Sequence, residues 1–438
     1  MDGLDAAPVP EGERRRVAVI GAGLVGLASA LWLARLGHHV TVVDRAPPEP
    51  GGSYRQACSY GNACTVAPHG VVPVATPGIA WRVPGMVLNP AGPLAIVWRY
   101  LPHLAPWLRA FLAASRPAEV ERIAGTLAGL LRHADAAYRP LVEEAGARHL
   151  ERHAGCLYLY RSDAAFAAAE ADNRLRERHG VALERLDAVA IRALEPRLAP
   201  LYRRGVLYPD AYTFDSPQVL AVAFAAAIRK RGGAIVRAEV RDLRCEGEGV
   251  RVGTDGTALR AERLVIAAGA HSRALVRQLG EDVLLDTERG YHVLFPEAGH
   301  LLGRPVCYPE HGFYMTPMAD GLRAAGTVEL GGLAVPARPV RTRMIRQTVA
   351  ELLPQAGAPG AEWMGFRPSM PDSLPVVARS ARHPAVTYAF GHGHLGLTLA
   401  GITGRLVADL VSERPPVLPL ATLRHDRFDA WGGKPGPG

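Results

Sequence analysis

The chain has 438 residues, of which 48% are hydrophobic and 21% charged, so it can build one large or two ordinary domains and is not globally disordered. The net charge of +8 comes with no zinc-finger spacing and no aromatic RNA-binding strand, so we expect no nucleic-acid partner and no metal site. The five cysteines are scattered and form no CxxC pair, which favours free thiols in a reducing, cytoplasmic compartment.

Both ends of the chain are polar and rich in Pro or Gly. Residues 1–15 lack the apolar core of a signal peptide, and we expect them to be a disordered lead. Residues 416–438 are expected to form a tail, and its final GGKPGPG is expected to be disordered as well. No run of about 18 uninterrupted apolar residues appears, so we expect no membrane-spanning helix.

The first structured segment is predicted to be a strand, a glycine turn, a helix and a second strand. The strands cover residues 17–20 and 40–43, and the helix covers residues 24–36 and ends at Gly37. Such a unit of about 30 residues is typical of a parallel crossover.

The turn contains a GxGxxG motif, which predicts a dinucleotide site. Gly21 permits the tight turn, Gly23 lets a pyrophosphate approach the backbone, and Gly26 lets the helix pack closely on the strand. The phosphates would then lie at the helix N-terminus, where free N–H groups and the dipole favour anions. Asp44, at the end of the second strand, would accept the ribose hydroxyls and would repel the 2′-phosphate of NADP.

Residues 73–113 interleave prolines, arginines and apolar residues with Trp81, Trp98 and Trp107, all three of which look exposed. The part from 94 to 112 is expected to be helical. One interpretation is a cap packed on the main body. The other is an amphipathic element that dips into a bilayer interface, which would place the protein peripherally on the inner face of the cell membrane.

The remaining elements alternate helices and strands. Residues 118–200 are expected to be mainly helical around a strand at 156–160. A helix at 216–231 precedes strands at 235–240 and 263–268. Further strands are predicted at 290–295, 312–317, 322–327 and 387–390, and helices at 342–353 and 397–410, with a Pro- and Gly-rich loop after residue 353.

This order of elements predicts an α/β protein with a discontinuous Rossmann-like nucleotide-binding domain of the glutathione-reductase type. We assign to that domain residues 16–72, 210–285 and 362–415. Residues 73–209 and 286–361 would form an inserted substrate or cap domain with a mixed or antiparallel sheet. The glycine-rich stretch 391–396, which leads into the last helix, favours FAD over NAD because its N–H groups could face the pyrimidine edge of a flavin.

The residues resemble a known family over about 16–415. The chain is similar to FAD-dependent oxidoreductases of the D-amino acid oxidase superfamily, and most similar to bacterial D-amino acid dehydrogenases of the small-subunit type. The motifs that carry the resemblance are VAVIGAGLVGLASALWLARLGHHVTVVDR, SYGNACTVAP, VIAAGAHSR, RGYHV, GFYMTPMADGLRAAGTVE, MGFRPSMPDSLPVVARS and AFGHGHLGLTLAGITGRLVADL.

The resemblance implies an FAD site and a substrate clamp. Arg367, in a GxRP element, would bind the substrate carboxylate, and Tyr314 would lie near the substrate. Cys64 stands where the family pattern has Gly, and we interpret its thiol as inert packing, with a reactive thiol as the alternative. His394 stands where some relatives have an arginine. The implied FAD-binding residues are Gly21, Gly23, Leu24, Val25, Gly26, Asp44, Arg45, Ser59, Asn62, Ala63, Val240, Ala268, Gly269, Gly391, His392, Gly393, Leu395, Gly396, Leu397 and Thr398.

Hydride transfer from a carbon to a flavin needs positioning more than acid–base groups. Arg367 could hold a carboxylate bidentately. The substrate amine must lose a proton, and the histidines with a suitable intrinsic pKa are His292, His392 and His394. Each could equally be structural. Tyr291 and Tyr314 could donate to the carboxylate or could be core aromatics.

We therefore expect oxidative deamination of a D-amino acid, with electrons passed to a quinone or another non-oxygen acceptor. The alternatives are an oxidase that uses O2, an enzyme for a secondary amine or imino acid such as D-proline, hydroxy-D-proline, sarcosine or glycine, and a non-catalytic FAD-binding subunit.

Overall fold

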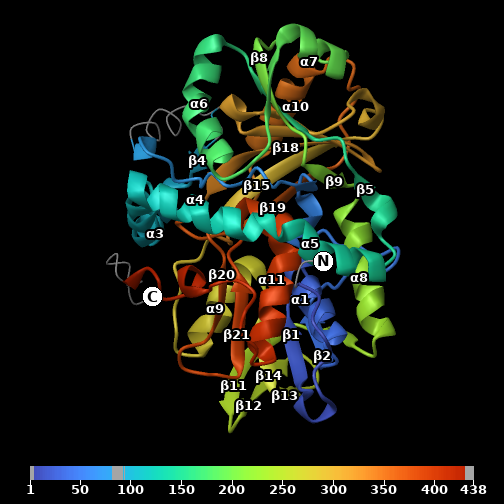
Figure 1. Ribbon diagram of the computed structural model, residues 1–438, viewed down its shortest axis with the longest axis vertical. Helices are drawn as coiled ribbons and strands as arrows, with labels where there is room; N and C mark the ends of the chain where they lie inside the picture. Colours follow the sequence, from blue (N-terminus) through green and yellow to red (C-terminus); the bar gives the residue numbers. More distant parts are fainter. Residues whose placement is uncertain (1–3, 81–91, 93, 430–438) are drawn as a thin grey trace.

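A six-stranded sheet lies in the lower half of the protein (Figure 1). The computed structural model describes residues 4–80, 92 and 94–429. The strand order is β10-β2-β1-β14-β21-β20, with every pair parallel except β20–β21. Its strands are β1 (Arg16–Ile20), β2 (His39–Asp44), β10 (Ala234–Arg237), β14 (Arg263–Ile266), β20 (Val376–Arg379) and β21 (Val386–Phe390).

Both faces of this sheet are covered, which explains why its central strands are apolar runs. Helices α1 (Leu24–Arg35), α8 (Pro217–Lys230) and α11 (Gly396–Val411) pack on one face. Helix α9 (Ser272–Gln278) and a small antiparallel sheet pack on the other. The strands of that small sheet are β11 (Val240–Glu246), β12 (Gly249–Thr254) and β13 (Leu259–Ala261).

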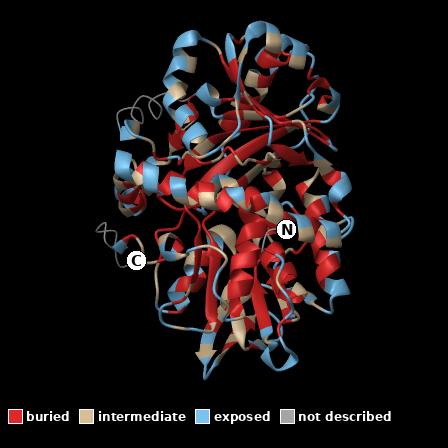
Figure 2. Ribbon diagram, in the orientation of Figure 1, coloured by how far each residue is buried: buried red, intermediate tan, exposed pale blue. Residues whose placement is uncertain are grey.

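Helix α11 with its preceding turn is long and apolar enough to cross a bilayer, but most of it is buried inside the protein. Figure 2 shows it red along most of its length, as α1 is. Trp32 of α1 donates to the carbonyl of Gly401 at 3.0 Å. Packing against α1, α5 and the sheet therefore accounts for its apolar composition.

The upper half of the protein contains a nine-stranded mixed sheet, ordered β19-β15-β18-β17-β16-β6-β8-β7, with β4 beside β18 (Figure 1). Helix α10 (Pro339–Leu352) packs on one face of it. The strands are β4 (Leu94–Ile96), β6 (Cys156–Tyr160), β7 (Glu184–Asp187), β8 (Arg204–Tyr208), β15 (Asp286–Phe295), β16 (Val306–Tyr308), β17 (Phe313–Met318), β18 (Gly321–Leu330) and β19 (Glu362–Ser369).

The remaining helices surround the two large sheets. Helices α4 and α5 cross the middle of the protein between them (Figure 1). A third, small sheet joins β3 (Thr65–Val66), β9 (Tyr212–Phe214) and β5 (Glu151–Arg152). The helices are α3 (Leu101–Ala114), α4 (Pro117–Arg132), α5 (Ala134–Glu144), α6 (Asp163–Arg178) and α7 (Ala188–Leu194).

The predicted fold class is confirmed: a Rossmann-like α/β layer carries a second, mixed sheet. The six-stranded sheet takes its strands from three separated parts of the chain, the arrangement that the discontinuous assignment expected. The numbered domain bounds stay a prediction.

Several predicted elements were wrong in detail. Residues 94–112 are not one helix, because β4 first pairs in parallel with β18 and only then does α3 begin. Trp107 is buried and donates to the carbonyl of Ser369 at 3.1 Å, whereas Trp98 is 64% exposed. Trp81 lies outside the described residues. The strand expected at 235–240 is divided, because β10 ends at Arg237 and β11 enters another sheet.

Two regions expected to be loops or tails are ordered. The stretch after residue 353 contains β19 and β20, which pair with β15 and β21. Leu4 and Val9 are buried near the N-terminus, and near the other end Arg427 forms an ion pair with the buried carboxylate of Asp372 at 2.7 Å. The expectation of a disordered lead is therefore wrong for residues 4–15, whereas the final GGKPGPG lies outside the described residues.

Candidate functional site

The turn between β1 and α1 has the shape that a dinucleotide cradle needs. Gly21 has a φ of +106°, and a Cβ there would lie 2.4 Å from the carbonyl oxygen of Ala267. A Cβ on Gly26 would lie 1.9 Å from the carbonyl oxygen of Gly21. A Cβ on Gly23, by contrast, would meet only the Ser59 hydroxyl, at 3.8 Å. Gly21 and Gly26 thus serve close packing, whereas Gly23 borders open space where a diphosphate fits.

Asp44 ties the end of β2 to this turn. Its two carboxylate oxygens accept the backbone N–H groups of Ala22 and Ala46, each at 2.7 Å. The carboxylate is held at the strand end beside the helix N-terminus and keeps lone pairs for ribose hydroxyls. The neighbouring Arg45 side chain lies 3.2 Å from the His271 ring at the rim of the same cavity.

A cavity of about 360 Å³ runs from this turn to the N-terminus of α11. It collects predicted cofactor residues from three distant parts of the chain. The ones that line it are Gly21, Gly23, Leu24, Val25, Asp44, Arg45, Ser59, Asn62, Val240, Ala268, Gly269, His392, Gly393, Gly396 and Leu397.

Five predicted cofactor residues do not line this cavity: Gly26, Ala63, Gly391, Leu395 and Thr398. Gly391 has a φ of +82° and allows the turn after β21. The Thr398 hydroxyl accepts the N–H of Ala67 at 3.1 Å, and Leu395 packs against Gly70, so both fix the segment after β3 to the start of α11. These residues shape the site without facing its open space, and for Ala63 the expectation of direct contact is not supported.

The open cradle at Gly23, the carboxylate at the end of β2 and the helix N-terminus at α11 together fit an FAD molecule. The pyrophosphate would lie at Gly23, the ribose at Asp44, and the pyrimidine edge at residues 393–397.

Arg367 lies on β19 next to this cavity. Its guanidinium group covers Gly290, where a Cβ would stand 2.4 Å from Cζ. Its hydrogen bond to the carbonyl of Thr327 is long, at 3.5 Å, and it forms no ion pair with any described residue. Phe366 and Pro368, its neighbours in β19, line the cavity. Arg367 itself is not among the lining residues, so a partly buried cation with donors to spare lies beside the cavity rather than in its wall.

His394 and Arg367 are brought together by a residue that the sequence did not single out. Glu288 pairs with Arg367 across β15 and β19, and its Oε2 lies 2.7 Å from Nε2 of His394. Burial opposes ionisation of Glu288, but the charge and hydrogen bond of His394 and the charge of Arg367 outweigh it, so its pKa lies below the usual value. Strand register alone creates this cluster, so nothing local in the sequence marks Glu288.

The other predicted catalytic residues divide between the two faces of the sheet. His292 and Tyr314 lie in one row across β15, β18 and β17, on the face that carries Glu288. Tyr314 bonds to the Tyr158 hydroxyl. Tyr291 points to the opposite face and donates to Glu329 at 3.0 Å, so the expected contact of Tyr291 with substrate is not supported.

His292 and His392 are unsuited to accepting a proton. Burial lowers the pKa of each to about 3. His292 stacks on Trp363 with ring centroids 5.1 Å apart, and His392 bonds to Thr403 at 2.9 Å. Both are structural histidines, which leaves His394 as the candidate base.

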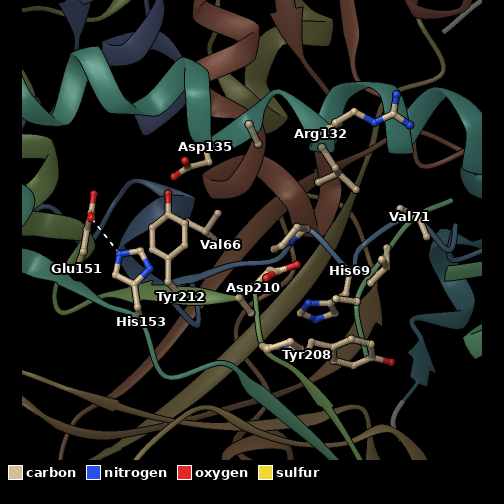
Figure 3. A pocket seen from close by; sticks show the side chains of 18 of the residues that line it. Val66, His69, Val71, Arg132, Asp135, Glu151, His153, Tyr208, Asp210 and Tyr212 are labelled. Carbon is tan, nitrogen blue, oxygen red and sulfur yellow. Dashed lines mark hydrogen bonds and ion pairs between the residues drawn. The ribbon is translucent and has the colours of Figure 1, made fainter. Parts of the chain in front are cut away.

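A second, larger cavity of about 510 Å³ opens between β3, α4, α5 and the turn before β9 (Figure 3). None of the predicted site residues lines it. Most of its charged side chains pair with one another, as His153 does with Glu151 in Figure 3 and Arg139 with Asp135 at 2.7 Å. The predicted cofactor residues therefore gather at the smaller cavity.

Comparison with known proteins agrees with this geometry. The family model for FAD-dependent oxidoreductases (DAO) matches residues 16–410. A D-amino-acid oxidase of Bradyrhizobium diazoefficiens is 40% identical over 96% of this chain and 100% of its own. A D-amino acid dehydrogenase of a Methylobacterium species is 33% identical over 94% and 99%. The glycine oxidase structure from Geobacillus kaustophilus has a TM-score of 0.74 at 22% identity, covering 94% and 99% of the two chains.

The protein belongs to the DAO family of FAD-dependent oxidoreductases. Its cofactor is FAD, and the resemblance found in the sequence is confirmed.

Proposed function

We propose that this protein deaminates D-amino acids oxidatively. The Cα–H hydrogen leaves with its electron pair, and the resulting imino acid is hydrolysed to a 2-oxo acid. Bound FAD would supply the hydride acceptor at N5. The names of the relatives that are 40% and 33% identical over nearly the whole chain support amino acids of D configuration as substrates.

The observation that carries the proposal is the state of Arg367. A guanidinium group forms two parallel hydrogen bonds with a carboxylate when its donors are free. Arg367 has such donors, lies against Gly290, and stands opposite Glu288, which bonds His394 in the loop before α11. A substrate carboxylate bound there would place its Cα beside the flavin site.

The direct test is anaerobic mixing of the holoenzyme with a panel of D- and L-amino acids, D-proline, hydroxy-D-proline, sarcosine and glycine, with flavin absorbance as the readout. We expect bleaching by D-amino acids. Arg367→Ala should keep FAD and lose about 100-fold or more in apparent substrate affinity, as one charge-assisted pair contributes. Bleaching only by L-amino acids, or an unaltered KM in Arg367→Ala, would contradict the proposal.

We further propose that the electrons pass to a quinone or another non-oxygen acceptor. Relatives named as dehydrogenases support this, whereas the 40% identical relative is named an oxidase. Reoxidation of the reduced enzyme should be faster with a soluble quinone analogue than with air-saturated buffer. Stoichiometric peroxide release would instead assign an oxidase.

Residues 73–113, of which 81–91 and 93 lie outside the described residues, are proposed to provide peripheral contact with the cytoplasmic face of the membrane. In this segment Trp98 is 64% and Leu112 45% exposed, and interfacial tryptophan is typical of such contact. Co-sedimentation with anionic vesicles should fall in Trp98→Ser. Equal sedimentation of the variant and the unchanged protein would argue against it.

A further inference from the structure

We propose that Glu288 is a positioning residue that holds His394 as the acceptor of the proton released by the substrate ammonium group. This inference rests on the proposed function and identifies how the amine is made ready for oxidation. Neither the GxRP element nor the glycine-rich loop identifies Glu288, because it enters the site through strand pairing.

The geometry begins with strand register. Glu288 lies directly opposite Arg367 in the β15–β19 pair and is only 5% exposed. His394 comes from the other direction, on the short turn Gly393–Leu395 before α11. Its Nε2 lies 2.7 Å from Oε2 of Glu288, and its side chain is 43% exposed. One end of the imidazole is thus fixed on a buried carboxylate while the other end is accessible.

Ionised Glu288 determines which ring nitrogen of His394 carries hydrogen. Its carboxylate can only accept hydrogen bonds, so Nε2 must be the donor. In the neutral ring Nδ1 then keeps its lone pair. Nδ1 has no hydrogen-bond partner among the described residues, so a base nitrogen of a half-exposed side chain remains available.

The arrangement matches the two polar groups of an α-amino acid. Arg367 and His394 both lie beside Glu288, one suited to the carboxylate and the other to the ammonium group. One N–H bond of the ammonium breaks, the proton goes to Nδ1, and the electron pair stays on the substrate nitrogen. That pair can then form the C=N bond as the α-hydrogen departs as hydride. The negative charge of Glu288 stabilises the imidazolium that forms.

The experiment compares anaerobic flavin reduction across a pH series in wild type, Glu288→Gln and Glu288→Asp. Glu288→Gln keeps a hydrogen-bond acceptor but removes the charge. We expect it to bind FAD and to lose about 10- to 100-fold in the reduction rate. In the plot of reduction rate against pH, the fall in rate on the acidic side should move by about one pH unit toward lower pH. The reason is that the imidazolium loses its anionic partner. This fall is called the acid limb below. Glu288→Asp should keep the wild-type limb.

Two further variants separate positioning from a general structural effect. Glu362→Gln removes a more exposed carboxylate on β19 that pairs with Arg346 at 2.6 Å, and it should change neither rate nor limb. His394→Ala should be slow and partly restored by added imidazole. An unmoved limb in Glu288→Gln, or no imidazole rescue, would overturn the inference while leaving D-amino acid oxidation intact. Failure of wild type to bleach with any amine would instead refute the proposed function.

Discussion

Replacing Gly290 by alanine tests whether the position of Arg367 controls substrate binding. A Cβ at residue 290 would stand 2.4 Å from Cζ and 2.5 Å from Nη1 of Arg367. Carbon atoms in contact normally stay about 3.5 Å apart or more, so the guanidinium must move by about 1 Å. Gly290 does not have a positive φ, and β15 is paired on both sides, so alanine should not disturb the sheet itself.

A displacement of about 1 Å at a substrate-positioning group costs on the order of 100-fold in rate. We therefore expect kcat/KM of Gly290→Ala to fall about 100-fold, or about 2.7 kcal/mol, with FAD content unchanged. Steady-state kinetics with the best D-amino acid, together with the flavin-to-protein absorbance ratio, measures both quantities. Gly129→Ala in α4, where a Cβ meets no atom within 4 Å, is the matched control. Wild-type kinetics in Gly290→Ala would refute the clamp.

Three further predictions concern the cofactor, a thiol and acid stability. Gly23→Ala should lower FAD affinity but keep the apoprotein Tm, whereas Gly26→Ala should lower both. The reason is that a Cβ at residue 26 clashes with the protein itself and a Cβ at residue 23 does not. Flavin titration measures the affinity, and apoprotein melting curves measure the Tm. Burial raises the pKa of the Cys64 thiol to about 12, so iodoacetamide should modify it only after unfolding, and rapid native modification would show a reactive thiol. Burial lowers the pKa of four histidines from 6.5 to between about 3 and 4, so on acidification the unfolded chain binds protons at these residues before the folded protein does. The free energy of unfolding should therefore fall as the pH drops below about 6.5. A free energy of unfolding in urea that stays constant from about pH 7 to pH 5 would contradict this. These histidines are His38, His69, His292 and His392.

The nucleotide-binding half of the site could be predicted from local sequence patterns. Strand, glycine turn, helix and acid follow one another within 16–44, so local periodicity and turn chemistry were sufficient there. The glycine loop at 391–396 and the motif around Arg367 could also be singled out, because each is contained in a short segment. Resemblance then supplied FAD, which the family match confirms.

The arrangement of residues on the substrate side depends on contacts between strands that are far apart in the chain. Strand β19 was missed because its pattern contains Gly and Pro and it is stabilised by pairing with β15, 69 or more residues earlier in the chain. That register sets Glu288 against Arg367 and sends Tyr291 to the opposite face, since alternate residues of a strand face opposite sides. Contacts between segments distant in the chain leave no local periodicity, so the sequence could name Arg367 and His394 but could not show that one buried carboxylate lies beside both.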